Sequence, residues 1–125
     1  MTTSCGCIKS IGENNIIKIL QENNINYVHD EAYFKDLLSS NNRLLRYDFI
    51  LFYNNKPYRL IEFDGEQHYT GWGHNLEDQK IIQNRDTIKN NYAFNHNIPL
   101  VRIPYTERDN ITLEMIMGDK YLINK

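Results

Sequence analysis

Two neighbouring runs decide the fold: LLRYDFILFY (residues 44–53) and YRLIEFD (58–64), joined by NNKP (54–57). Both runs are rich in aliphatic and aromatic residues on alternating positions, which is typical of strands covered on both faces. The Asn-Asn-Lys-Pro segment supplies the turn. We therefore expect a central antiparallel hairpin, with the first run as one continuous strand.

Helical and strand patterns precede this hairpin. Ser10 and Glu13 have the spacing of a capping box, which predicts a helix that begins at Ser10. Residues 25–29 predict a short strand. We expect an irregular, partly helical stretch from there through Leu38.

A helix, a strand and a second helix are expected after the hairpin. Apolar positions of an amphipathic helix over 76–95 recur at helical spacing; they are Ile81, Ile88 and Tyr92. A buried strand over 100–104 and a final helix capped by Asp109 or Asn110 follow. The order predicts an α/β fold with a central mixed sheet of about four strands flanked by helices.

Composition narrows the class of protein. The chain has 125 residues, 41% of them hydrophobic and 24% charged, with a formal net charge of -2. This is typical of a single globular domain. No apolar run approaches the ~20 residues of a membrane helix, so we expect no membrane partner and a cytoplasmic location. The mild negative charge means that nucleic-acid binding would need a local basic patch.

Three carboxylates lie where the strand pattern should bring them together. Side chains alternate along a strand, so the hairpin can place Asp48, Glu62 and Asp64 at one end of the sheet. Clustered carboxylates repel one another unless they share a proton or hold a divalent cation. The alternative is that cationic partners neutralise them; the candidates are Arg46, Arg59 and Arg102.

Four further residues are candidates for the same site. Glu13 lies on the helix face that should look at the sheet, although its place after Ser10 also suits a cap. His68 follows the acidic strand in a glycine-marked loop, where an imidazole can move protons near neutral pH. Asp86 and Lys89 are three residues apart on the long helix, so they form either a surface ion pair or part of the site.

These residues occur in four strings that resemble nucleases of the PD-(D/E)XK superfamily. The strings are YDF (47–49), IEFDGEQHY (61–69), RDTIK (85–89) and LVRIP (100–104). They are most similar to the very-short-patch-repair-like branch, which includes phage homing endonucleases with a Glu, Asp, His, Asp constellation. The resemblance covers residues 10–104 and implies a restriction-endonuclease-like core in a protein that acts in a cytoplasm, encoded by a cell, a phage or a virus.

The resemblance implies hydrolysis of phosphodiester bonds in double-stranded DNA with Mg²⁺, for which Mn²⁺ would substitute. The implied metal ligands are Asp48, Glu62 and Asp64. A bound metal lowers the pKa of its water and neutralises charge growing on phosphate. Cutting of both strands by a homodimer and nicking of one strand are both compatible with the resemblance.

The resemblance also implies roles for the remaining candidates. Glu13 would orient groups from the first helix, His68 would activate water or protonate the leaving oxygen, and Asp86 would support His68. The usual Glu-x-Lys of the superfamily is here residues 62–64, Glu-Phe-Asp, so the strand lacks its lysine. Either His68 replaces that lysine or Lys89 reaches in from the helix.

The first nine residues resemble the remnant of a zinc ribbon, because Cys5 and Cys7 precede the helix start. Two thiolates cannot complete a tetrahedral zinc site, so we expect no zinc and no folded module there. Residues 10–125 should form a single nuclease-like catalytic domain. The alternatives are an inactive nuclease-fold DNA-binding module and a structural or partner-binding domain.

Overall fold

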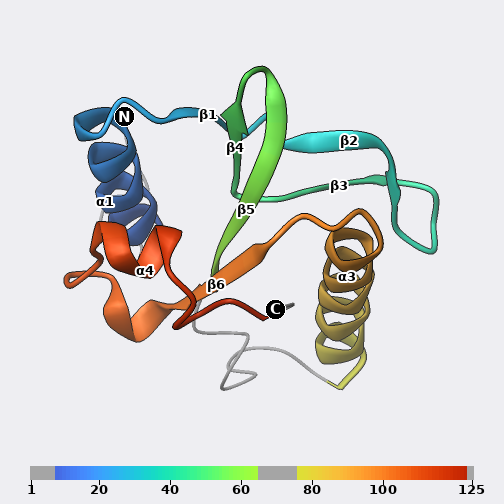
Figure 1. The fold of residues 1–125 in the computed structure, drawn as a ribbon. Helices are drawn as coiled ribbons and strands as arrows, with labels where there is room; N and C mark the ends of the chain where they lie inside the picture. Colours follow the sequence, from blue (N-terminus) through green and yellow to red (C-terminus); the bar gives the residue numbers. More distant parts are fainter. Residues whose placement is uncertain (1–7, 65–75, 124–125) are drawn as a thin grey trace.

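The protein is an α/β structure in which helices flank a mixed four-stranded sheet (Figure 1). The computed structural model describes residues 8–64 and 76–123. Its elements are α1 (Ile8–Glu22), β1 (Asn26–His29), β2 (Tyr33–Leu38), β3 (Leu44–Arg46), β4 (Phe49–Tyr53), β5 (Lys56–Asp64), α3 (Leu76–Asn95), β6 (Leu100–Pro104), a 3-10 helix (Tyr105–Glu107) and α4 (Leu113–Met117).

The expected hairpin of β4 and β5 forms the centre of the sheet. The strand order is β1-β4-β5-β6, with antiparallel pairs up to β5 and a parallel pair between β5 and β6. The parallel pair requires a crossover, which α3 supplies. Asn54 and Asn55 make the hairpin turn with φ angles of 54° and 65°, a backbone region that Asn tolerates well.

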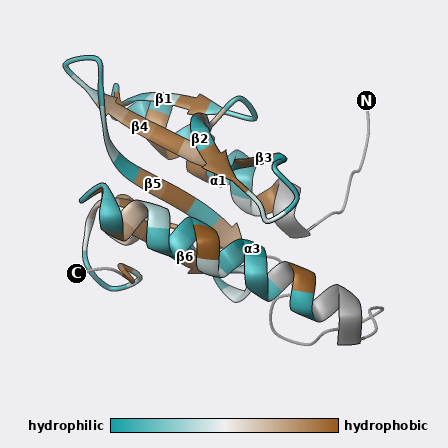
Figure 2. Ribbon diagram, turned by 90° about the vertical axis from the view of Figure 1, so that its right-hand side faces the viewer, coloured by the Kyte–Doolittle hydropathy of each residue, from teal (hydrophilic) through white to brown (hydrophobic). Residues whose placement is uncertain are grey.

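Two apolar clusters cover the two faces of this sheet. On one face, Phe49, Ile61 and Phe63 pack against Ile16 and other residues of α1. On the other face, alternate residues of the same strands pack with the second half of α3, and Figure 2 shows the strands as the more hydrophobic elements. Because side chains alternate, the acidic residues that flank Phe63 face α3.

The run 44–53 is not one continuous strand, as the sequence predicted. It breaks at Tyr47 and Asp48 into β3 and β4, and β3 pairs with β2 in a separate two-stranded sheet. The prediction of a partly helical stretch through Leu38 was also wrong, because residues 33–38 form β2. The cause in both cases is tertiary: Leu37 and Leu45 are buried against α3, which stabilises a ribbon outside the main sheet.

Three finer expectations also need correction. The first helix begins at Ile8, two residues before Ser10, and the final helix is capped by Thr112, whose side chain accepts a hydrogen bond from the backbone N–H of Met115. Ile81 is 47% exposed, because the residues of α3 that pack on the sheet lie in the second half of the helix. The remaining predicted elements are confirmed. None of the helices within the described ranges is long and apolar enough to cross a membrane.

Candidate functional site

The break between β3 and β4 is held by two reciprocal hydrogen bonds. The backbone N–H of Asp48 donates to Oε2 of Glu62 at 2.7 Å, and the backbone N–H of Phe63 donates to Oδ2 of Asp48 at 2.7 Å. Each carboxylate therefore satisfies a backbone donor of the other strand where the ladder ends. The two acidic side chains are fixed next to one another by the backbone itself.

Glu62 also meets a cation from the helix. Lys89 Nζ lies 3.0 Å from Glu62 Oε1, and the two side chains are only 15% and 7% exposed. Burial raises the pKa of Glu62 above its ordinary value, and the neighbouring charge of Asp48 raises it further, while Lys89 and Arg102 act in the opposite direction. The net result is a carboxyl group that holds its proton more firmly than a solvated glutamate.

Arg102 on β6 organises the other carboxylates. Its Nη1 lies 2.8 Å from Asp64 Oδ1, its Nη2 lies 3.4 Å from Asp86 Oδ1, and its Nε donates to Asn90 Oδ1 at 3.0 Å. Burial alone lowers the pKa of Arg102, but Asp64, Glu62 and Asp86 more than offset it, so its pKa lies above the ordinary value. Arg102 therefore joins the end of the sheet to α3.

Tyr47 fixes the position of α3 relative to this end of the sheet. Its hydroxyl donates to the backbone carbonyl of Lys89 at 2.7 Å, and the Lys89 ammonium lies 5.8 Å from its ring centroid. Burial raises the pKa of the Tyr47 hydroxyl, so the group stays protonated and remains a donor. Tyr47 thus positions the residue that contacts Glu62.

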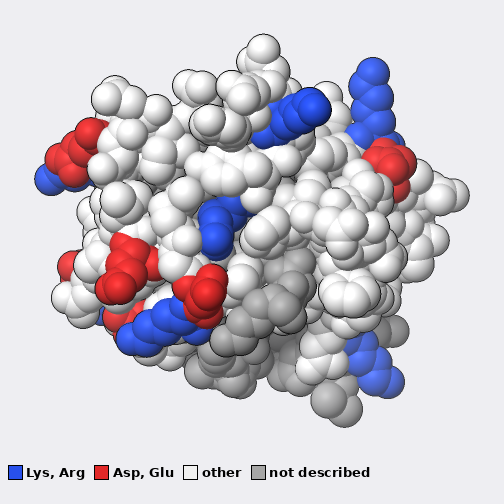
Figure 3. Space-filling view, viewed as in Figure 1, with Lys and Arg blue, Asp and Glu red and all other residues white. Residues whose placement is uncertain are grey.

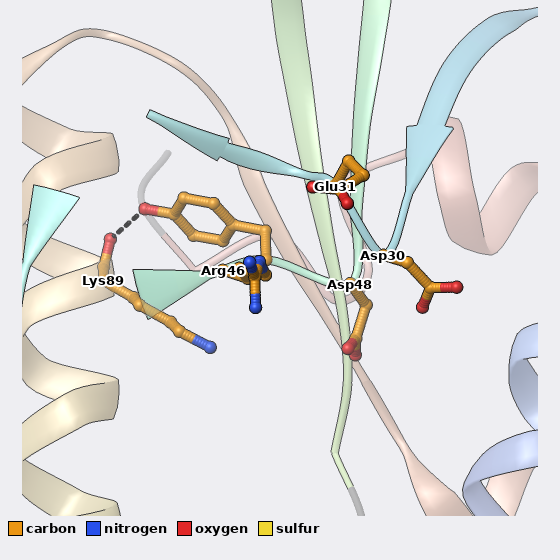
Figure 4. A pocket seen from close by; sticks show the side chains of 6 residues that line it. Asp30, Glu31, Arg46, Asp48 and Lys89 are labelled. Atoms are coloured by element: carbon orange, nitrogen blue, oxygen red, sulfur yellow. Dashed lines mark hydrogen bonds between the residues drawn. The ribbon is translucent and has the colours of Figure 1, made fainter. Parts of the chain in front are cut away.

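A polar pocket of about 530 Å³ opens beside these residues (Figure 4). Its lining residues carry three carboxylates, two cations and one phenol; they are Asp30, Glu31, Arg46, Tyr47, Asp48 and Lys89. In Figure 4, Lys89 extends from α3 toward the strands, while Asp30 and Asp48 lie on the far side of the pocket. The pocket can admit a polar ligand between Lys89 and Asp48.

Glu13 faces the sheet, as predicted, and contacts a histidine of β1. Its Oε1 lies 3.0 Å from His29 Nε2, and the Glu13 side chain is 16% exposed. His29 pairs with Phe49 across β1 and β4 and stacks on its ring at 4.6 Å, so both face α1. His29 Nε2 also lies 3.6 Å from Asp30 Oδ1, and Asp30 lines the polar pocket, so His29 links Glu13 to the rim of the pocket.

The structure brings together part of the predicted site. Asp48, Glu62 and Lys89 meet, and Lys89 reaches in from the helix as one of the two expected alternatives. Asp64 and Asp86 are joined to Arg102. In residues 8–64 and 76–123, no group of three His, Cys, Asp or Glu side chains is arranged to hold a metal ion. His68, Cys5 and Cys7 lie outside the described residues, so their roles stay predictions.

The donor set at Asp48 and Glu62 fits a magnesium ion. Mg²⁺ is commonly held by one or two carboxylates, with water and substrate phosphate oxygens completing the shell. Asp48 lines the polar pocket, and Glu62, which accepts a hydrogen bond from the Asp48 backbone, is the second carboxylate of this kind. A bound Mg²⁺ would supply charge neutralisation at a phosphate and a water of lowered pKa.

Several residues of the site were missed or misjudged from the sequence. Arg102 was expected only as one of three cations, yet its guanidinium binds Asp64 Oδ1 directly, whereas Arg59 donates to the backbone carbonyls of Met117 and Gly118. Tyr47 was noted only as part of a string. The sequence did contain one signal for this contact: Arg102 is a charged residue within an otherwise apolar, buried strand, where a charge needs a partner.

Searches against protein-family models, curated proteins and solved structures found no match. Figure 3 shows acidic and basic side chains interspersed over one face of the molecule, without a large patch of one sign.

Proposed function

We propose that this protein is a Mg²⁺-dependent endodeoxyribonuclease with a restriction-endonuclease-like core. The observation that carries the proposal is the meeting of Asp48, Glu62 and Lys89 at one end of the central hairpin, with Asp48 and Lys89 lining a polar pocket. Two carboxylates and one ammonium are the residue types that metal-assisted phosphodiester hydrolysis uses. The helix lysine supplies the cation that the strand lacks.

Each residue has a role that follows from its position. Asp48 and Glu62 would hold the metal, and their backbone hydrogen bonds would keep both carboxylates in place during turnover. Lys89 would bind a non-bridging phosphate oxygen or orient the attacking water from the other side of the pocket. Tyr47 and Arg102 would position α3 and the end of the sheet.

The proposal is tested by nicking of supercoiled plasmid in Mg²⁺ or Mn²⁺. Asp48→Asn is the decisive variant, because the asparagine oxygen can still accept the hydrogen bond from Phe63 while the charge is lost. We expect wild-type protein to relax the plasmid and Asp48→Asn to lower the rate by on the order of 100-fold or more. Asp109→Asn removes an exposed carboxylate away from the site and serves as the matched control.

Two outcomes would contradict this function. An intact plasmid after incubation with wild-type protein in both metals, with no metal-induced change in melting temperature, would exclude a metal-dependent nuclease acting on this DNA. Equal nicking by wild type and Asp48→Asn, at equal purity, would assign the activity to a contaminant or to another site.

The ion pairs of Arg102 favour a second candidate, a structural or partner-binding domain. Arg102 lies within 4 Å of Glu62, Asp64 and Asp86, so a single cation neutralises much of the acidic cluster. In that case the carboxylates stabilise the fold and bind no metal. A divalent-ion titration separates the two candidates, because a purely structural cluster shows no metal-induced rise in melting temperature.

A further inference from the structure

The ribbon of β2 and β3 stands outside the main sheet, next to the candidate site (Figure 1). Its inner face is firmly attached to the domain. Leu37 and Leu45 are buried, and the Phe34 ring lies 5.2 Å from the Tyr92 ring of α3. The Tyr92 hydroxyl also donates to Asp36 Oδ1 at 2.7 Å. The ribbon is therefore a fixed projection with one face already used.

The outer face of the ribbon has a different chemical character. Tyr33 pairs with Arg46 and Leu38 pairs with Leu44 across the two strands, so these side chains share one face. Tyr33, Leu38 and Leu44 are 36%, 38% and 45% exposed, and the Arg46 guanidinium lies 5.8 Å from the Tyr33 ring centroid. This face combines an aromatic ring, two leucines and a guanidinium.

The ribbon has a positive net charge, whereas the whole chain has a negative one. Residues 33–46 carry three exposed cations, Lys35, Arg43 and Arg46, and one carboxylate, Asp36, which is bonded to Tyr92. The chain as a whole has a net charge of -2. The tip, residues 39–42, adds serine and asparagine side chains that can form hydrogen bonds. The ribbon is therefore complementary to an anionic partner.

We propose that the outer face of the β2–β3 ribbon docks on double-helical DNA. A two-stranded ribbon fits the major groove, where cations reach flanking phosphates and apolar side chains contact thymine methyl groups. Arg46 belongs both to this face and to the lining of the pocket, so a duplex held by the ribbon continues toward Asp48. The choice of partner rests on the proposed nuclease function, while the docking surface is tested separately.

The test is duplex binding without turnover. Fluorescence anisotropy of a labelled mixed-sequence duplex of about 30 base pairs, close to three helical turns, is measured in EDTA over a range of salt concentrations. Lys35→Gln/Arg43→Gln should weaken binding roughly tenfold and lower the slope of log K against log salt by about 2. Lys18→Gln/Lys120→Gln, which removes two exposed cations on the α1 and α4 side, is the charge-matched control and should bind like wild type.

Every outcome of this comparison decides the proposal. Equal binding by the ribbon variant and the control, with both folded by circular dichroism, overturns it. Loss of self-association or of binding to phosphatidylserine vesicles in the ribbon variant, without duplex binding by wild type, also overturns it and assigns the face to another partner. Ribbon-dependent duplex binding by a wild-type protein that cuts no DNA supports the docking surface while the nuclease proposal fails.

Discussion

Lys89 Nζ on α3 lies 3.0 Å from Glu62 Oε1 on β5, and both side chains are largely buried. The two residues are 27 positions apart, so only the docking of α3 across the sheet brings them together. Tyr47 enforces that docking through the backbone carbonyl of Lys89. The ion pair thus joins α3 to the sheet, and its lysine supplies the positive charge of the candidate site.

Lys89→Met should destabilise the fold and abolish nicking. Removing one partner of a buried pair leaves the other carboxylate less well compensated, although Arg102 at 3.9 Å offsets part of the loss. We expect a decrease of about 2 kcal/mol in the free energy of unfolding at neutral pH. Urea denaturation measures the change. Lys80→Met on the exposed part of the same helix is the control, and an equal loss in both variants would contradict the role of the pair.

Glu62→Gln should change how stability depends on pH. The pKa of Glu62 is raised in the folded protein by burial and by Asp48, so the folded state binds its proton more tightly than the unfolded chain. The contribution of Glu62 is therefore fully present below its ordinary pKa of 4.5 and is lost as pH rises through the folded pKa. Wild-type stability, measured relative to Glu62→Gln, should fall from about pH 4 upward.

The same experiment on Glu114→Gln provides the reference, because Glu114 is an exposed residue of α4. Its difference from wild type should not follow the profile of Glu62→Gln. A Glu62→Gln difference that rises with pH over this range would show that Lys89 and Arg102 outweigh burial at this carboxyl group.

Much of the fold was predictable because its strands carry strong local signals. The β4–β5 hairpin, β6 and α3 follow from alternation, a turn and helical periodicity, all of which depend on nearby residues. The ribbon was missed because β2 has a mixed polar sequence, and its strand form depends on pairing with β3 and on packing of Phe34 and Leu37 in the cluster shared with α3. The break at Asp48 was missed because it depends on hydrogen bonds to residues 14 and 15 positions away.

The sequence predicted which residues belong to the candidate site better than it predicted which of them bind one another. Alternation placed Glu62 and Asp64 on one face, and the structure confirms this. It could not show that Lys89 would bind Glu62, which depends on how α3 packs on the sheet, or that Arg102 would bind Asp64, which depends on the register of β6 against β5. Alternation also could not predict that Glu13 would bind His29, because that contact depends on how α1 packs against β1.

Gly12→Ala should disturb the site from the opposite face of the sheet. A Cβ atom at Gly12 would overlap the Phe63 ring, which lies between Glu62 and Asp64 in the sequence and points toward α1. Because the ring sits in a packed core, relief of this overlap requires movement of α1 or β5, and we expect a loss of about 1–3 kcal/mol. Phe63→Leu should restore part of the stability when combined with Gly12→Ala, and strictly additive losses in this double-mutant cycle would contradict the contact.

Arg102→Gln should lower stability yet strengthen the response to Mg²⁺. The variant removes the ion pair of the buried Asp64, which should cost about 3 kcal/mol in the free energy of unfolding. It also removes a positive charge 3.9 Å from Glu62, so a divalent cation would meet less repulsion at the acidic cluster.

The measurement is the rise in melting temperature on adding Mg²⁺. For the variant, an ion concentration ten times the Kd would add roughly 1.4 kcal/mol, or about 5 °C for a domain of this size. Wild type should respond less at the same concentration, and Arg59→Gln should respond like wild type, because Arg59 donates to the backbone carbonyls of Met117 and Gly118. If Mg²⁺ leaves all three melting temperatures unchanged, the carboxylates serve the fold alone, and the structural candidate replaces the nuclease.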